Sequence, residues 1–391
     1  MKLAAVLVAT VAVAAGAWAK GAPVLGWDYA HDRLAWFDPA TLQTVPGRKP
    51  PMRDGPCSWS LSPDRTQLAY SSCNRDIVFL DARTMQTRTM YASDRRLGHL
   101  NGLAWLRRDR LLATSYVDAL PTLLVIDPQR RRVLRSVALQ RPAYHRTIVG
   151  GTGVYLLGSA DGFQPAQVAV ADAEGNMRTA TVDRISTGTI VTNDDGADEP
   201  VVRTRGVGFA VDPQGRRAFV VSPELLIAEV DLATLTVGYH GPTRATAKSE
   251  EGPTRTAAWL GGGLLAVSGA DSVGRGAAMT PYGLHVVDTR TWTVRSIDTG
   301  AAAFQVAPSA LLVQRGDITA PHDVVAFAAD GAERWRVTLP QSQWLSVYGR
   351  YGYVCSNETL VRVIDAATGT TVSRPRGRAC AAVLDGPASD V

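Results

Sequence analysis

The sequence predicts an all-β fold, a single β-propeller of four-stranded antiparallel blades, and three observations carry that prediction. An apolar strand, a polar turn and a second short strand recur eight times along the 391 residues. The apolar runs are short and end at Pro, Asp or Gly, which is typical of strands. No stretch has the apolar period of an ordinary amphipathic helix. The eight turns begin at Asp38, Asp81, Asp127, Asp172, Asp231, Asp288, Ala329 and Asp365.

The second unit shows the four expected strands most clearly. They are expected at residues 58–61, 67–71, 76–80 and 87–90. The fifth unit repeats the same order over residues 207–230. Four evenly spaced antiparallel strands in each repeat are typical of a propeller blade. The Asp of each turn is expected to accept hydrogen bonds from the backbone N–H groups of its own turn.

The repeat count favours eight blades, with seven as the alternative. The first unit lacks a first strand of its own, because few residues separate it from the N-terminal apolar run. We expect the C-terminal segment 379–384 to supply that strand and to close the ring. Because each unit buries its apolar face only against its neighbours, residues 20–391 are expected to form one domain, a monomer.

The N-terminal residues 1–19 have the pattern of a secretory signal peptide. Lys2 is followed by a short apolar run that ends in Ala17-Trp18-Ala19, a small-x-small cleavage site. The sequence therefore predicts a secreted, extracytoplasmic protein with no membrane span after cleavage. The alternative is that the run is kept as an anchor, since its length is near the lower limit for a membrane span.

The cysteine count agrees with an oxidising compartment. An even number of cysteines in an exported chain favours disulfides. Cys57 and Cys73 flank a tight turn and are candidates for one bridge, and Cys355 and Cys380 near the C-terminus for another. The sequence alone leaves the connectivity open.

The formal net charge of +5 does not by itself indicate a nucleic-acid partner. Basic clusters such as Arg107-Arg108-Asp109-Arg110 fall in predicted turns, without the interleaved aromatic residues that nucleic-acid binding requires. No nucleic-acid partner is therefore predicted.

The turn motifs resemble those of a known family. Ser62-Pro63-Asp64-Arg65 and Asp212-Pro213-Gln214-Gly215, each followed by an apolar strand and Asp-x-x-Thr, are similar to YVTN/YncE-type secreted β-propeller repeats of the quinoprotein-like group. The resemblance covers nearly the whole mature chain. It implies the propeller fold, which enzymes, scaffolds and binding proteins share.

Departures from the repeat gather in the loops that join the second and third strands of a unit, or one unit to the next. Five of the six histidines lie in or beside such loops, and several of these loops carry an Asp. The candidate ligand-binding residues, at one end of the central channel, are His99, Asn101, Asp118, Tyr144, His145, Asp161, Asp271 and His322. These carboxylates could hold a divalent cation; the alternative is that they cap their own turns.

Two functions follow from these candidates. The first is a secreted, non-catalytic propeller that binds a protein, a glycan or a small ligand through its loop-rich face. The alternative is a metal-assisted lyase or lactone hydrolase that uses histidine as general acid or base at the same face. A pyrroloquinoline-quinone dehydrogenase is disfavoured, because the family's vicinal cysteine pair is missing. A serine hydrolase is disfavoured too, because no Gly-x-Ser-x-Gly motif occurs.

Overall fold

A computed structural model gives the fold of most of the chain. The described residues are 23–28, 31–51, 56–72, 76–90, 99–117, 120–192, 201–241, 254–272, 279–316, 321–339, 344–356, 359–374 and 382–383. The predicted signal peptide lies outside them. Every named element of regular structure in these ranges is a β-strand.

The strands form eight antiparallel sheets within the described residues. We number the sheets along the chain. Sheet one contains β1 (Val24–Asp28), β2 (Arg33–Phe37) and β33 (Ala382–Val383), and sheet two contains β3 (Pro56–Leu61), β4 (Gln67–Ser72), β5 (Ile77–Asp81) and β6 (Gln86–Met90). Sheet three contains β7 (His99–Arg107), β8 (Arg110–Val117), β9 (Leu120–Asp127) and β10 (Arg132–Ala138). Sheet four contains β11 (Ala143–Val149), β12 (Thr152–Leu157), β13 (Gln164–Ala171), β14 (Met177–Thr192) and β15 (Val201–Arg205).

The remaining four sheets follow the same order. Sheet five contains β16 (Gly208–Val211), β17 (Arg217–Val221), β18 (Ile227–Asp231) and β19 (Val237–His240). Sheet six contains β20 (Thr254–Gly261), β21 (Leu264–Ser272), β22 (Met279–Pro281), β23 (Leu284–Asp288) and β24 (Thr293–Asp298). Sheet seven contains β25 (Ala301–Val306), β26 (Leu311–Gly316), β27 (Pro321–Phe327) and β28 (Glu333–Thr338), and sheet eight contains β29 (Trp344–Tyr348), β30 (Tyr351–Ser356), β31 (Thr359–Asp365) and β32 (Thr371–Ser373).

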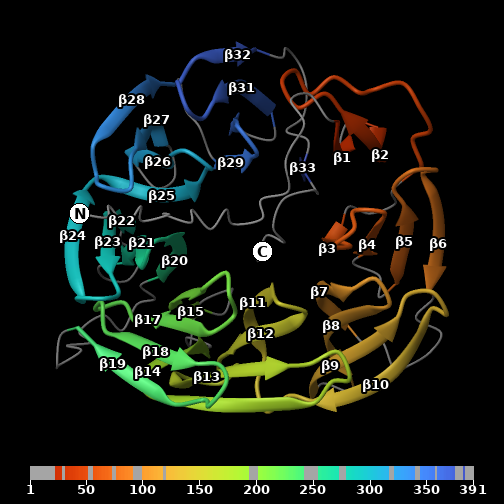
Figure 1. Cartoon of the computed structure of the whole chain (residues 1–391), viewed down its shortest axis with the longest axis horizontal. Coiled ribbons are helices and arrows are strands. Elements are labelled where there is room, and N and C mark those ends of the chain that lie inside the picture. Colours follow the sequence, from red (N-terminus) through yellow and green to blue (C-terminus); the bar gives the residue numbers. More distant parts are fainter. Residues whose placement is uncertain are drawn as a thin grey trace, which may run out of the picture.

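The sheets surround a common centre, with strands such as β3 and β7 near it and β6 and β10 at the rim (Figure 1). The predicted all-β propeller fold is therefore confirmed. The last described strand, β33, pairs with the first, β1, through Gly26↔Val383 and Trp27↔Ala382. This pairing and the number of sheets support the predicted eight blades and C-terminal closure, which stay predictions.

The hydrophobic core lies between neighbouring sheets. One cluster joins Ala69 and Phe79 of sheet two to Leu103 and Trp105 of sheet three, all buried. The Trp105 indole also donates to the Ser60 carbonyl across the same boundary, at 2.9 Å. Because each sheet packs against the next, the buried apolar side chains of one sheet stabilise its neighbour as well.

The aspartates of the recurrent turns cap those turns, as predicted. Asp81 Oδ1 accepts the backbone N–H groups of Arg83 and Thr84 at 3.0 and 2.7 Å. Asp231 makes the equivalent bonds to Ala233 and Thr234. We call the side of the ring that carries these turns the turn face, and the opposite side the loop face.

A second recurrent contact joins the sheets at the turn face. In six of the boundaries between described sheets, a side chain of one sheet donates to a carbonyl in the Asp turn of the next. We call this bond a latch. The latches are Trp36 to Ala82 O (3.2 Å), Arg135 to Glu174 O (3.1 Å), Arg178 to Ala233 O (2.8 Å), Arg295 to Ala329 O (2.8 Å), Trp335 to Ala366 O (3.2 Å) and Ser373 to Ala40 O (2.7 Å).

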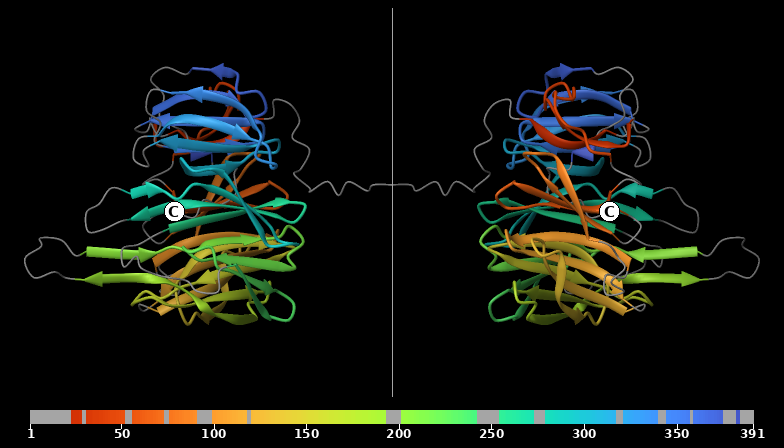
Figure 2. Two further views of the ribbon diagram at one scale, coloured as in Figure 1. Left: turned by 90° about the vertical axis from the view of Figure 1, so that its left-hand side faces the viewer. Right: turned by 90° about the vertical axis from the view of Figure 1, so that its right-hand side faces the viewer.

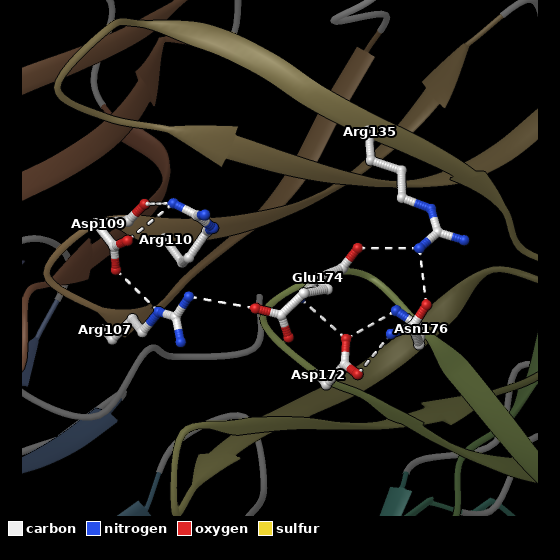
Figure 3. A network of polar contacts seen from close by, with 7 residues as sticks. All are labelled: Arg107, Asp109, Arg110, Arg135, Asp172, Glu174 and Asn176. Atoms are coloured by element: carbon white, nitrogen blue, oxygen red, sulfur yellow. Dashed lines mark hydrogen bonds and ion pairs between the residues drawn. The ribbon is translucent and has the colours of Figure 1, made fainter.

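Figure 3 shows the latch between sheets three and four. Arg135 donates to Glu174 O and to Asn176 Oδ1, while Arg107 forms ion pairs with Asp109 and the Glu174 carboxylate. The basic turn that begins at Arg107 thus contributes to a boundary between sheets.

One element departs from the four-stranded plan. β14 is 16 residues long and continues beyond its pairing with β13 to form a hairpin with β15, from Gly188↔Arg205 to Thr192↔Val201. The two strands project beyond the loop face (Figure 2). Among the described residues, no helix has the length and hydropathy to cross a membrane.

Candidate functional site

A pocket of about 340 Å³ lies on the loop face, at the foot of the β14–β15 hairpin. Sheet three contributes Tyr116 from the end of β8, and the hairpin contributes Thr189. The other residues come from the start of β11 and from the β12–β13 loop. The lining residues are Tyr116, Pro142, Ala143, Tyr144, Ala160 and Thr189.

The foot of the hairpin is fixed to the β12–β13 loop by backbone contacts. Thr189 N donates to Ser159 O at 3.0 Å, and Gly162 N donates to Thr189 O at 2.9 Å. Gly188 has φ +149°, and a Cβ there would collide with the carbonyl oxygens of Gly162 and Ser159. Glycine is therefore required at residue 188 for the hairpin to cross the loop.

Tyr144 ties the pocket wall to the same loop. Its hydroxyl donates to Ser159 O at 2.8 Å and lies 3.0 Å from Thr189 Oγ1. Gly158 leaves room for the ring, because a Cβ there would lie 2.7 Å from Tyr144 Cε2. The phenol is therefore held in one orientation and presents its ring to the pocket.

The chemistry of the pocket is apolar contact and neutral hydrogen bonding. Burial, with a smaller contribution from Tyr144 nearby, raises the pKa of the Tyr116 hydroxyl. Tyr116 therefore stays protonated at neutral pH. Leu120, which is 62% exposed, pairs with Val117 on the loop face; because Val117 packs toward sheet two, Leu120 lies on the side of sheet three away from Tyr116. Tyrosines that combine apolar area with a hydroxyl are typical of binding surfaces.

Two of the predicted site residues lie at this pocket and one lies just behind it. Tyr144 lines the pocket. Asp161 follows the lining residue Ala160, is exposed, and its backbone is held by Ser159 Oγ. The ring of His145 stacks on Phe209, with centroids 6.2 Å apart, in the boundary between sheets four and five.

Asp271 lies on another part of the loop face, where it pairs with Arg255 at 2.7 Å. The Arg255 side chain is buried, donates to Pro223 O and lies over the Tyr282 ring at 3.5 Å. Asp271 thus has a structural partner, an arginine that joins sheet six to sheet five.

The side chains of the other four predicted site residues lie outside the described residues. The backbones of His99 and Asn101 lie in β7 and that of His322 in β27, but their side chains lie outside the described residues. Asp118 also lies outside them.

The described histidines lie apart from one another. His31 pairs with Asp28, His240 stacks on Trp292 beside Glu229, and His285 faces Tyr282. Among the described residues, no three His, Cys, Asp or Glu side chains group as metal ligands would. The predicted divalent cation and the acid–base site remain hypotheses, because the His99 and His322 side chains are not described.

One of the four cysteines, Cys355, has a described side chain. Cys355 is buried in β30 and disulfide-bonded. The Cys57 side chain, Cys73 and Cys380 lie outside the described residues. The pairings Cys57–Cys73 and Cys355–Cys380 therefore stay predictions.

Sequence reasoning missed most of the pocket. Tyr116, Pro142, Ala143, Ala160 and Thr189 are ordinary residue types for strand ends and loops. The one usable signal was length, because the connection between the fourth and fifth units is much longer than a repeat requires. That excess is the β14–β15 hairpin, which supplies Thr189.

The comparisons with known proteins show the fold and no family. No family model matches the sequence, and no curated protein matches it. Membership of the YVTN/YncE-type family therefore stays a prediction.

Solved structures resemble the chain more clearly. The dihydro-heme d1 dehydrogenase NirN, solved in complex with DHE, has a TM-score of 0.63 and 12% identity, and the match covers 93% of this chain and 75% of that one. The computationally designed Ika8 protein has a TM-score of 0.54 and 13% identity, over 85% and 95% of the two chains. Saccharomyces cerevisiae Sqt1 has a TM-score of 0.52 and 10% identity, over 81% and 84%. At these identities the similarity concerns the propeller architecture alone.

Proposed function

We propose that this chain is a non-catalytic β-propeller that binds a protein partner through its loop face. The single observation that carries the proposal is the pocket at the foot of the β14–β15 hairpin. A rigid ring presents two tyrosines, an exposed leucine and a projecting hairpin on one side. Binding residues are commonly found on loops that such a scaffold holds in place.

The pocket chemistry favours binding over catalysis. Among the described residues, its lining contains no carboxylate, histidine or cysteine, and the raised pKa of Tyr116 keeps its hydroxyl neutral. Aromatic rings in a concave site, with apolar residues around them, are the usual anchor points for a partner's side chain. The proposed partner therefore inserts an apolar or aromatic side chain between Tyr116 and Tyr144.

The test uses a substitution that fills the pocket. We expect Ala160→Arg, at an exposed lining position, to abolish capture of the partner from the extracytoplasmic fraction of the native host. The protein is immobilised, and the captured proteins are compared by quantitative mass spectrometry. The partner is the protein that wild type retains and Ala160→Arg loses.

The matched control is Ala367→Arg, at an exposed alanine of the turn face. It adds the same side chain to the opposite side of the ring and should retain the partner at the wild-type level. Equal capture by wild type and by Ala160→Arg would refute binding at this pocket.

The proposed place of action is outside the cytoplasm. The apolar N-terminal run with its Ala17-Trp18-Ala19 end supports export. Edman or mass-spectrometric sequencing of the protein from its native host should find Lys20 at the N-terminus; an intact Met1 terminus would refute cleavage there.

A further inference from the structure

Among the described residues, two boundaries lack a latch, one between sheets five and six and the other between sheets two and three. By its place in β6, the latch donor there should be Arg88, and the acceptors should be the carbonyls of Pro128 and Gln129 in the next turn. Among the described residues, neither carbonyl receives a side-chain hydrogen bond, and the Arg88 guanidinium has no hydrogen-bonding or ionic partner. Beside Arg88 a hydrogen bond runs the other way, from Arg131 Nη1 of sheet three to Thr89 O of sheet two at 3.2 Å.

A groove of about 270 Å³ lies where that latch would be. Its lining residues come from β4, β5, β6 and the β9–β10 turn; β6 and β10 lie at the rim of the ring (Figure 1). Its volume is near the lower end for small-ligand sites, about 300 Å³. The lining residues are Gln67, Phe79, Leu80, Asp81, Gln86, Arg88, Pro128, Gln129 and Arg131.

The groove combines three kinds of group. Phe79 and Pro128 are buried and form an apolar floor, whereas the Leu80 side chain points to the opposite face of sheet two. Gln67, Gln86 and Gln129 supply side-chain amides, which both donate and accept hydrogen bonds. Arg88 and Arg131 supply guanidinium groups, which bind carboxylates through paired N–H donors.

The charge of the lining limits the ligand. Two arginines and one aspartate give a net charge of +1. Asp81 Oδ1 is occupied by its own turn, and these bonds hold the pKa of the carboxyl below its usual range. Asp81 therefore stays ionised at neutral pH, which disfavours a dianion and leaves its other oxygen able to accept a hydroxyl donor.

We propose that the groove between sheets two and three binds a sugar acid, a monosaccharide unit with one carboxylate. The carboxylate pairs with Arg88, the hydroxyls meet the glutamine amides and the turn carbonyls, and the apolar face of the ring lies on Phe79 and Pro128. This site is on the rim and is separate from the pocket of the loop face. Its occupation does not depend on the function proposed above.

The test is titration calorimetry of the full chain with four probes: sodium glucuronate, glucose, sodium acetate and inorganic phosphate. Wild type should bind glucuronate saturably and more tightly than the other three. Arg88→Gln should weaken glucuronate binding about tenfold, the usual order for one charge-assisted contact. Gln86→Ala should weaken it as well, through the lost hydroxyl contact.

The matched control is Arg132→Gln, which removes the same charge from an exposed neighbour outside the groove. Its affinity for glucuronate should equal that of wild type, which separates a specific contact from general attraction. The proposal is overturned if folded wild type shows no saturable glucuronate binding, or if acetate or phosphate binds equally well. Equal loss in Arg88→Gln and Arg132→Gln would overturn it too.

Discussion

Gly102 shows how a single residue sets the packing of several strands. It lies in β7, where Arg146 of β11 extends past it to reach Ser58 Oγ of β3 at 3.2 Å. A Cβ at residue 102 would lie 2.5 Å from Arg146 Nη1 and would also collide with Thr114 Oγ1. The missing side chain therefore leaves space for an arginine that connects three inner strands.

We expect Gly102→Ala to lower the free energy of unfolding by about 1–3 kcal/mol, as overpacking usually does. Urea unfolding followed by tryptophan fluorescence measures the change. Gly238→Ala is the control, because a Cβ there would meet His240 Nε2 at an ordinary 3.4 Å. If the two alanines behave alike, the space at Gly102 has no structural role.

At this scale the sequence predicted little of the site. Tyr144 and His145 are adjacent in the chain and were both candidates, yet in β11 alternate side chains point to opposite faces of the sheet. Tyr144 therefore reaches the pocket, while His145 packs on Phe209. Which of two neighbours faces the pocket depends on the register at a bulge between Ala143 and His145, and that register has no pattern of its own in the sequence.

The recurrent turn is the element that the sequence predicted best. Its Asp, its backbone donors and its Thr are neighbours in the chain, so a local motif contains the whole interaction. Asp288 is the extreme case. Hydrogen bonds from the Arg290 side chain, and to a smaller extent from its backbone N–H, lower the pKa of the Asp288 carboxyl to about 2.

This shift predicts a pH dependence for the turn. The folded pKa lies below the value of about 3.9 for an unfolded Asp, so folding favours the ionised form. Its contribution is complete above about pH 4 and is lost as the pH falls from about 4 to about 2. Thermal unfolding measured across that range should show a shallower pH dependence for Asp288→Asn than for wild type. Parallel profiles would contradict the assignment.

The β14–β15 hairpin is the element that sequence patterns did not predict. The foot of the hairpin is bonded to a loop of its own sheet, from Ser159 to Gly162, through contacts that do not recur in the other units described. A sequence repeat predicts only the contacts that recur in every unit. The structure of an inserted segment cannot be predicted from the repeat, because the residues that it contacts do not recur. The pocket depends on that insertion, which explains why most of its lining was missed.

At the scale of the whole molecule, the first and last described strands lie side by side. β33 pairs with β1, and Cys355 of the neighbouring sheet is disulfide-bonded. The fold class was predictable because eight similar units allow few arrangements that bury every apolar face. The partner and its chemistry were not, because the propeller architecture is shared by proteins of unrelated function.

We expect a bridge between Cys355 and Cys380 that holds β33 near β1. Peptide mapping without reduction should recover these two cysteines in one linked peptide, and Cys57 with Cys73 in another. Reduction should lower the free energy of unfolding by about 2–4 kcal/mol, the usual range for a disulfide. Recovery of Cys355 linked to Cys57 or Cys73 would contradict this closure.

The latches have a consequence for how such a ring could change over generations. In five of the six, the donor belongs to one sheet and the acceptor to the next sheet along the chain, and in the sixth, sheet eight donates to sheet one. A tandem gene duplication of one unit would copy a donor and an acceptor together, and both new boundaries would be complete at once. A unit with a latch at both of its boundaries can thus be duplicated without losing either contact, whereas the two boundaries that lack a latch among the described residues are free to diverge.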